Sequence, residues 1–148
     1  MFASIVVGTD GSDTARKAVE RATELALSIG ASLEIVSAYE PVPSGRLRGE
    51  RHEVPPDVEW MVNPREDVDA TLKQAQAAAE GAGLQRVVTH ARQGDPADAI
   101  LDVAEEQHAD LIVVGNKGMT GAKRFLLGSV PNKVSHHAPC SVLIVRTT

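Results

Sequence analysis

Three glycines and a serine that follow an apolar run have the spacing of a phosphate-binding segment. Gly115 and Gly118 come directly after the run 111–114, and Gly128 and Ser129 follow in the pattern G-x-x-G-x9-G-S. Glycine lets the backbone approach a ligand closely, and the unpaired N–H groups that open a helix favour phosphate. Ser129 can act as the N-cap of that helix or donate its hydroxyl to a phosphate oxygen.

A carboxylate, Asp10, follows the first apolar run between Gly8 and Gly11. At the end of a strand, Asp10 can accept hydrogen bonds from a ribose or reach a Mg²⁺ that phosphates hold. The alternative is a local role in a turn or as a helix N-cap, for which Ser12 and Asp13 compete. We favour the ligand role.

Apolar runs alternate with helically spaced segments along the whole chain. We expect strands at 5–7, 33–39, 86–91, 111–114 and 141–146, and helices at 15–29, 68–82, 96–108 and 129–137. Strands that are apolar on both faces predict an α/β fold, with an open parallel sheet covered by helices on both faces. Ligands bind such sheets at the carboxyl ends of the strands, where the strand order reverses. The loops after the first and fourth strands are therefore predicted to form one site.

Composition limits the classes of function. The 148 residues argue for a single domain, with a long insertion at about 40–65 that holds five of the eight prolines. A net charge of -5 and 3% aromatic residues speak against binding to nucleic acid, and no apolar run is long enough to cross a membrane. The single cysteine, Cys140, precedes a strand expected to be buried, and together with the lack of an export signal it predicts a cytoplasmic protein.

Several common motifs of nucleotide-binding and hydrolytic enzymes are missing. The sequence has no Gly-Lys-Ser or Gly-Lys-Thr, no G-x-G-x-x-G fingerprint and no nucleophile elbow. The adjacent His136 and His137 diverge on a helix and suit its C-terminal end better than a metal site. We therefore expect a binding module with no catalytic residues, and at most slow, incidental ATP hydrolysis.

The whole chain resembles the universal stress proteins. The resemblance is carried by Val6–Ser12, by Asp110–Gly115, by Gly118 through Gly128-Ser129-Val130, and by Pro139–Arg146. It implies a Rossmann-like sheet of the adenine nucleotide alpha-hydrolase type, with five parallel strands in the order 3-2-1-4-5. It also implies a homodimer that pairs the last strands (141–146) and membership of the ATP-binding branch, which carries the glycine pattern.

The family's binding residues map onto this sequence by position. Asp10 would meet the ribose or a metal, and the backbone of Ala38 would meet the adenine edge. Lys117 would either help to hold phosphate or stay solvated. The remaining candidates line ribose and phosphates or flank the residues that do: Gly8, Thr9, Val114, Gly115, Gly118, Gly128, Ser129, Val130 and Pro131.

The resemblance leaves the ligand's phosphate count open. ATP, with Mg²⁺ reached through Asp10, is the first expectation, and AMP is another candidate. Some similar family members with proline after Gly-Ser-Val, as at Pro131 here, prefer cyclic AMP. The alternative hypotheses are a nucleotide hydrolase and a purely structural dimer with an empty site. We expect the nucleotide to serve a regulatory role in the response to stress.

Overall fold

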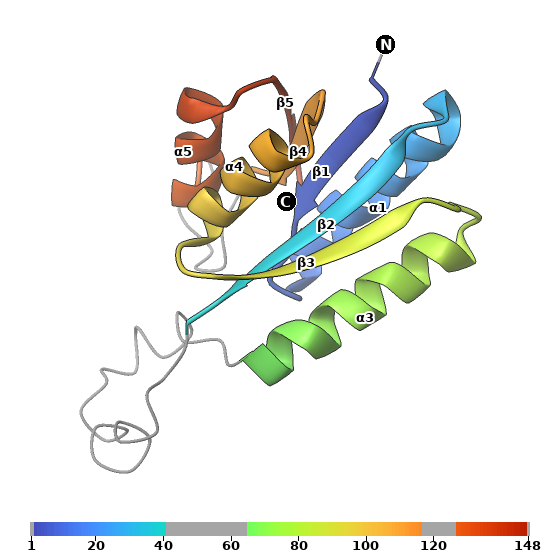
Figure 1. Cartoon of the computed structure of the whole chain (residues 1–148), viewed down its shortest axis with the longest axis horizontal. Helices are drawn as coiled ribbons and strands as arrows, with labels where there is room; N and C mark the ends of the chain where they lie inside the picture. The colour runs from blue at the N-terminus through green and yellow to red at the C-terminus, as the bar shows by residue number, and fades with distance from the viewer. Residues whose placement is uncertain (1, 41–64, 117–126, 148) are drawn as a thin grey trace.

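A five-stranded parallel sheet forms the centre of the protein in the computed structural model (Figure 1). The structure describes residues 2–40, 65–116 and 127–147. The strands lie in the order β3-β2-β1-β4-β5, which confirms the predicted order and the predicted α/β fold. Along the chain the elements are β1 (Ser4–Gly8), α1 (Asp13–Ile29), β2 (Ser32–Tyr39), α3 (Arg65–Gly81), β3 (Val87–Gln93), α4 (Pro96–Glu106), β4 (Leu111–Gly115), α5 (Ser129–His137) and β5 (Ser141–Val145).

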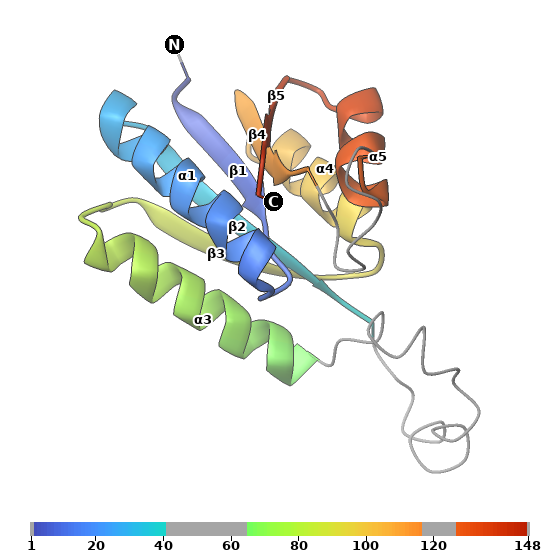
Figure 2. The same cartoon turned by 180° about the vertical axis from the view of Figure 1, so that it is seen from behind.

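Each face of the sheet buries its own aliphatic core. Ile5 and Leu33 pack with α1 and α3 on one face, and Val6 and Ile112 pack with α4 and α5 on the other. Figure 1 shows α4 and α5 on the near side of the sheet, and Figure 2, which is seen from behind, shows α1 and α3 on the other side. Because side chains alternate along a strand, neighbours such as Ile5 and Val6 supply both cores. Full burial of one such side chain contributes about 1.5–3 kcal/mol.

The helix caps follow the sequence closely. Ser12 Oγ accepts a hydrogen bond from Ala15 N (3.2 Å), so Ser12 is the N-cap of α1. Gly30 ends the helix in the left-handed conformation, with φ of 71°. Asp95 caps α4 through Asp98 N (3.1 Å) and precedes Pro96, the first helical residue. These caps fix where the loops that leave the strands give way to helices.

The outer strands differ from the prediction that all strands are apolar and buried. Val88 on β3 is 47% exposed, and Leu143 and Ile144 on β5 are 41% and 37% exposed. The strand order explains this, because β3 and β5 lie at the two edges of the sheet: α3 packs extensively against β3 but α4 only slightly, and β5 has little helix packing. Cys140, expected in the core ahead of a buried strand, is only partly buried.

Helix α3, at the end of the predicted insertion (about 40–65), begins three residues before the predicted start at 68. Arg65 is already the first residue of α3, whereas residues 41–64 lie outside the described residues. Glu40 follows the end of β2 directly.

Candidate functional site

The carboxyl ends of β2, β1 and β4 meet at one edge of the sheet, where the strand order reverses. Gly8 lies opposite Val36, and Val7 lies opposite Val113. Thr9 N donates to Val36 O (2.9 Å) just beyond the end of β1. This edge carries ten of the predicted site residues, while Lys117 and Gly118 fall outside the described residues: Gly8, Thr9, Asp10, Ala38, Val114, Gly115, Gly128, Ser129, Val130 and Pro131.

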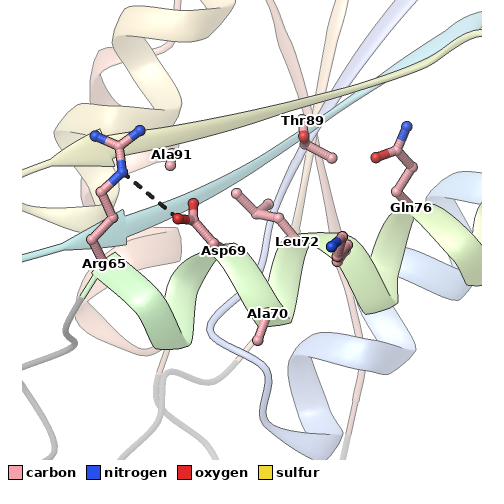
Figure 3. Close-up of a pocket in the computed structure, with 8 residues that line it drawn as sticks. Arg65, Asp69, Ala70, Leu72, Gln76, Thr89 and Ala91 are labelled. Carbon is pink, nitrogen blue, oxygen red and sulfur yellow. Dashed lines mark ion pairs between the residues drawn. The ribbon is translucent and has the colours of Figure 1, made fainter.

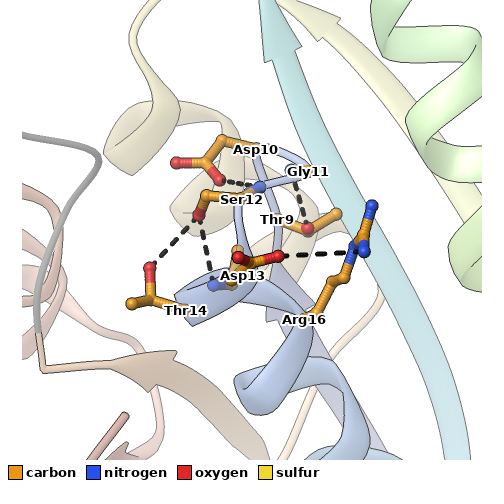
Figure 4. A network of polar contacts seen from close by, with 8 residues as sticks. Thr9, Asp10, Gly11, Ser12, Asp13, Thr14 and Arg16 are labelled. Carbon is orange, nitrogen blue, oxygen red and sulfur yellow. Dashed lines mark hydrogen bonds and ion pairs between the residues drawn. The ribbon is translucent and has the colours of Figure 1, made fainter. Parts of the chain in front are cut away.

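The loop after β1 is held by its own side chains (Figure 4). Asp10 Oδ1 accepts from Ser12 N (2.8 Å), and Thr9 Oγ1 accepts from Gly11 N (3.1 Å). Gly11 has φ of 84°, a conformation that favours glycine. Asp10 thus takes the local turn role that the sequence left as the alternative. Its other carboxylate oxygen points away from the turn and stays available to a ligand (Figure 4).

A metal at this edge would depend on the ligand for most of its coordination. Within residues 2–40, 65–116 and 127–147, no group of three or more His, Cys, Asp or Glu side chains could hold a metal ion. Mg²⁺ commonly binds through one or two carboxylates together with substrate phosphates and water. Asp10 fits that pattern as a single protein ligand.

The backbone of Ala38 faces the gap beyond β1. Val36 O accepts from Thr9 N, and Leu33 N donates to Arg86 O on the opposite side of β2. Backbone groups alternate between the two sides of a strand, so even-numbered residues of β2 face β1. Since β1 ends at Gly8 opposite Val36, the N–H and C=O of Ala38 face the space past its end. That side of β2 is where the sequence prediction places the adenine edge.

The start of α5 contradicts one of the two roles predicted for Ser129, that of the N-cap. Gly128, with φ of -65° and ψ of 168°, is the N-cap, and Ser129 is the first helical residue. Gly128 O accepts from Asn132 N (3.1 Å), which closes the first turn and excludes the N-cap role for Ser129. No side chain among the described residues caps this helix. The N–H groups of Ser129 and Val130 therefore open α5 with the partial positive charge that favours phosphate.

A side chain at Gly8 would collide with α4. A Cβ on Gly8 would overlap Cδ1 of Ile100 on α4 and lie 3.0 Å from its Cγ1. Ile100 is 4% exposed and belongs to the core on that face. The glycine thus lets α4 pack closely against the strand that carries the loop.

Two residues that sequence reasoning missed tie the site together. Asn116 Oδ1 accepts from Thr147 N (2.8 Å) and Thr147 Oγ1 (3.1 Å), and Asn116 O accepts from Gly128 N (3.1 Å). Asn116 stands inside the glycine pattern, which is a signal that could have drawn attention to it. Nothing in the sequence points to Thr147 as its partner.

Lys133, one turn after Ser129, links α5 to α4 through ion pairs. Lys133 Nζ lies 2.8 Å from Asp98 Oδ1 and 3.4 Å from Asp95 Oδ2. The hydrogen bond that Lys133 donates to Asp98, followed by the charges of both carboxylates, raises the pKa of Lys133. This lysine is therefore engaged with α4 and is not held towards the open end of the helix.

A groove of about 520 Å³ lies elsewhere, between α3 and the outer strand β3 (Figure 3). Arg65 and Asp69 form an ion pair there, with Nε and Oδ2 at 3.8 Å, and Thr89 lines the groove from the strand (Figure 3). None of the predicted site residues lines this groove. The candidate site is defined by the loops at the switch point.

The comparisons with known proteins agree with this geometry. The model of the universal stress protein family matches residues 1–146. The chain belongs to this family. A universal stress protein of Mycobacterium tuberculosis is 39% identical over 147 residues, which cover 99% of this chain and 98% of the relative. The family resemblance drawn from the sequence is thereby confirmed.

Solved structures of family members include two nucleotide complexes. A universal stress protein in complex with cAMP is 35% identical, with a TM-score of 0.75, and covers 99% of this chain and 98% of that one. A universal stress protein from Archaeoglobus fulgidus in complex with dAMP is 26% identical, with a TM-score of 0.69, over 97% of this chain and 98% of that one. Family members of this fold therefore bind adenine nucleotides. Separately, no helix among the described residues has the length and apolar character to cross a membrane.

Proposed function

We propose that this universal stress protein binds an adenine nucleotide at the carboxyl edge of its sheet and acts as a nucleotide-dependent regulatory module in a stress response. The observation that carries the proposal is that β1 and β4 are neighbours at the switch point, so that the loop after β1 and, through Asn116 and Gly128, the open start of α5 both follow their carboxyl ends. The two relatives in complex with cAMP and dAMP support an adenine base and at least one phosphate.

Each part of the nucleotide has a matching group. The backbone of Ala38 would receive the adenine edge, and the outward oxygen of Asp10 would receive the ribose hydroxyls or a Mg²⁺. The N–H groups of Ser129 and Val130, with the Ser129 hydroxyl, would receive phosphate oxygens. Gly115, at the end of β4, would let the backbone approach the sugar.

ATP is our first candidate ligand and cyclic AMP the second, which the 35% identical cAMP complex specifically favours. The two differ in how they depend on metal. The triphosphate would reach Asp10 through Mg²⁺, whereas a cyclic monophosphate carries one charge and needs no metal bridge. Titration calorimetry with each nucleotide, with and without Mg²⁺, separates them. An affinity that rises several-fold with Mg²⁺ and falls in Asp10→Asn supports ATP, and an affinity indifferent to Mg²⁺ supports cyclic AMP.

We propose binding without rapid turnover. Asp10 uses Oδ1 to hold Ser12 N in its own turn, which suits a residue that orients a ligand and not one that moves to activate water. The ligand would act by stabilising the conformation to which it binds more tightly. Mg²⁺-dependent release of phosphate or pyrophosphate within minutes, lost in Asp10→Asn, would show an enzyme instead.

The variants that test the site have matched controls on the same elements. Ser129→Ala should weaken binding about ten- to a hundredfold, because a hydrogen bond to a charged phosphate contributes roughly 1.5–3 kcal/mol, while the backbone donors keep some affinity. Ser135→Ala, which removes a serine from the same helix where it bonds Asn132 O, should bind as the wild type does. Asp13→Asn, on a side chain that is 96% exposed, is the control for Asp10→Asn. Equal affinity in Ser129→Ala and wild type would show that the phosphate does not bind at the start of α5.

We propose a homodimer that pairs β5 with β5 of a second copy. In the sheet as described, β5 pairs with β4 and leaves its other edge outermost, and Leu143 and Ile144 are exposed on opposite faces. Edges of this kind are ready to pair with another strand. Ile144→Lys should give a monomer in sedimentation equilibrium, whereas Val88→Lys on the opposite edge strand should not. A monomeric wild type, or a dimer lost equally in both variants, would contradict this pairing.

We further propose that the protein works in the cytoplasm. Cys140 is a free thiol, as is usual where cellular reductants keep cysteines reduced. Burial raises the pKa of this thiol, with a smaller contribution from the charge of Asp110. The thiol therefore stays protonated and unreactive at neutral pH. Microscopy of a tagged full-length protein in its own cells tests the location.

A further inference from the structure

One asparagine joins the segments on either side of the phosphate-binding pattern. Asn116 N donates to Val145 O (2.9 Å), which ties the end of β4 to the end of β5. Asn116 O accepts from Gly128 N (3.1 Å), the residue that opens α5. Its side-chain Oδ1 accepts two further hydrogen bonds, both from Thr147. A single residue thus holds a strand end, a helix start and the residues beyond β5.

Thr147 is buried and fully engaged. It is 2% exposed although it lies beyond the last strand. Its N and Oγ1 both bond Asn116 Oδ1, at 2.8 and 3.1 Å, and its carbonyl oxygen accepts from Lys17 Nζ on α1 at 3.3 Å. A hydrogen-bonded path therefore runs from the start of α5 through Asn116 and Thr147 to the first turns of α1.

This path spans the two halves of the candidate site. Helix α1 begins directly after the loop that carries Asp10, and α5 begins with the N–H groups offered to phosphate. A change in the distance between the two helix starts would change how well one ligand can contact both. Misplacing a binding group by a fraction of an ångström is enough to lose affinity when the groups around it are rigid.

We propose that Asn116 and Thr147 are positioning residues that set the start of α5 relative to the loop after β1, so that Thr147 controls nucleotide affinity without touching the nucleotide. This inference rests on the proposed nucleotide-binding function. Thr147 acts through Asn116, because its hydroxyl and N–H hold the side chain whose own carbonyl group holds Gly128. The residues beyond β5 thereby help to position the binding groups of the site.

The test uses a substitution that keeps shape and removes one hydrogen bond. Thr147→Val should lower the affinity for the adenine nucleotide about three- to tenfold, and Thr147→Ser should keep it within about twofold. The matched control is Thr23→Val on α1. Thr23 is a threonine, 5% exposed, whose Oγ1 donates to Val19 O (2.8 Å) far from the carboxyl edge. It should lose stability but bind as the wild type does.

A second measurement reads the position of α5 without any nucleotide. In hydrogen exchange of the unliganded protein, Thr147→Val should speed exchange at Gly128 N–H and in the first turn of α5, and Thr23→Val should not. Unchanged exchange there in Thr147→Val overturns the inference. The inference is also overturned if the wild type binds nucleotide and Thr147→Val binds it equally well. The same holds if Thr147→Val and Thr23→Val lose affinity to the same extent. A wild type that binds no nucleotide overturns the proposed function instead, and the exchange experiment still decides whether Thr147 positions α5.

Discussion

Adding one methyl group at Gly8 should disturb the protein through α4. In Gly8→Ala the new Cβ would overlap Cδ1 of Ile100, lie 3.0 Å from its Cγ1, and lie 4.0 Å from Val36 O. Ile100 is 4% exposed, so its Cδ1 can turn away only within the packed core. Overpacking of this kind destabilises a protein by about 1–3 kcal/mol. We expect urea unfolding to report a loss in that range.

A second substitution makes the reasoning specific. Ile100→Val removes Cδ1 and should by itself cost about 0.5–1.5 kcal/mol. In Gly8→Ala/Ile100→Val the overlap with Cδ1 is gone, so the double variant should be more stable than the sum of the single effects predicts, by about 1 kcal/mol. Gly81→Ala is the control, because nothing lies within 4 Å of a Cβ there.

The same pair of variants links packing to binding. Gly8→Ala should weaken nucleotide binding because the strand end that carries Thr9 and Asp10 must move, and the double variant should recover part of the affinity. Strictly additive stability losses, or a Gly8→Ala protein as stable as the wild type, would refute the contact with Ile100. Recovery of stability without recovery of affinity would show that the glycine also contacts the ligand itself.

Three further substitutions test individual contacts. Gly11→Ala should destabilise by about 1–2 kcal/mol in urea unfolding, because φ is 84° and the new Cβ would lie 2.9 Å from Thr71 Oγ1; a neutral effect would contradict this strain. Ser12→Ala should cost about 1 kcal/mol by removing the N-cap of α1, and unchanged stability would show that another group replaces it. Asp110 accepts from Ala3 N (2.7 Å) and Ser4 N (3.1 Å), and these bonds lower its pKa. Its contribution to stability is therefore present above the unfolded-state pKa of about 3.9 and is lost as pH falls through the lower folded-state pKa. Asp110→Asn should have a lower melting temperature than the wild type at pH 7 and a difference that shrinks in strong acid; a constant difference would contradict the assignment.

Local signals made most of the fold predictable. Asp95 followed by Pro96 marks the start of α4 because side-chain capping and the fixed φ of proline act within one turn. Gly30 marks the end of α1 for a similar reason. The order of the strands came from the family resemblance, and the structure confirms it.

Long-range contacts were beyond the reach of the sequence. Asn116 and Thr147 are 31 residues apart, and neither has a side chain whose type demands the other. The sequence predicts Gly8 as a site glycine because it stands close to Asp10, but it does not reveal that a Cβ there would overlap Ile100 on a distant helix. The exposure of Leu143 also depends on the position of β5 at the edge, which an apolar run alone does not reveal.

The ligand roles of the candidate residues remain predictions. The structure places Asp10, Ser129 and the backbone of Ala38 at the carboxyl edge of the sheet. The N-cap of α5 is Gly128, and not Ser129 as one prediction had it. Lys117 and Gly118 stay predictions because they lie outside the described residues. Their part in phosphate binding follows from the family pattern alone.

Thermal unfolding with a panel of nucleotides tests the central claim most directly. The purified protein would be melted with ATP, ADP, AMP, cyclic AMP and GTP, each with and without Mg²⁺. A ligand at 100 times its dissociation constant stabilises the folded state by about 2.7 kcal/mol, or roughly 5–10 °C for a chain of this length. The account predicts such a shift for one or more adenine nucleotides, none for GTP, and a smaller shift in Ser129→Ala than in Ser135→Ala. No shift with any adenine nucleotide, or an equal shift with GTP, would contradict an adenine-nucleotide site at this edge of the sheet.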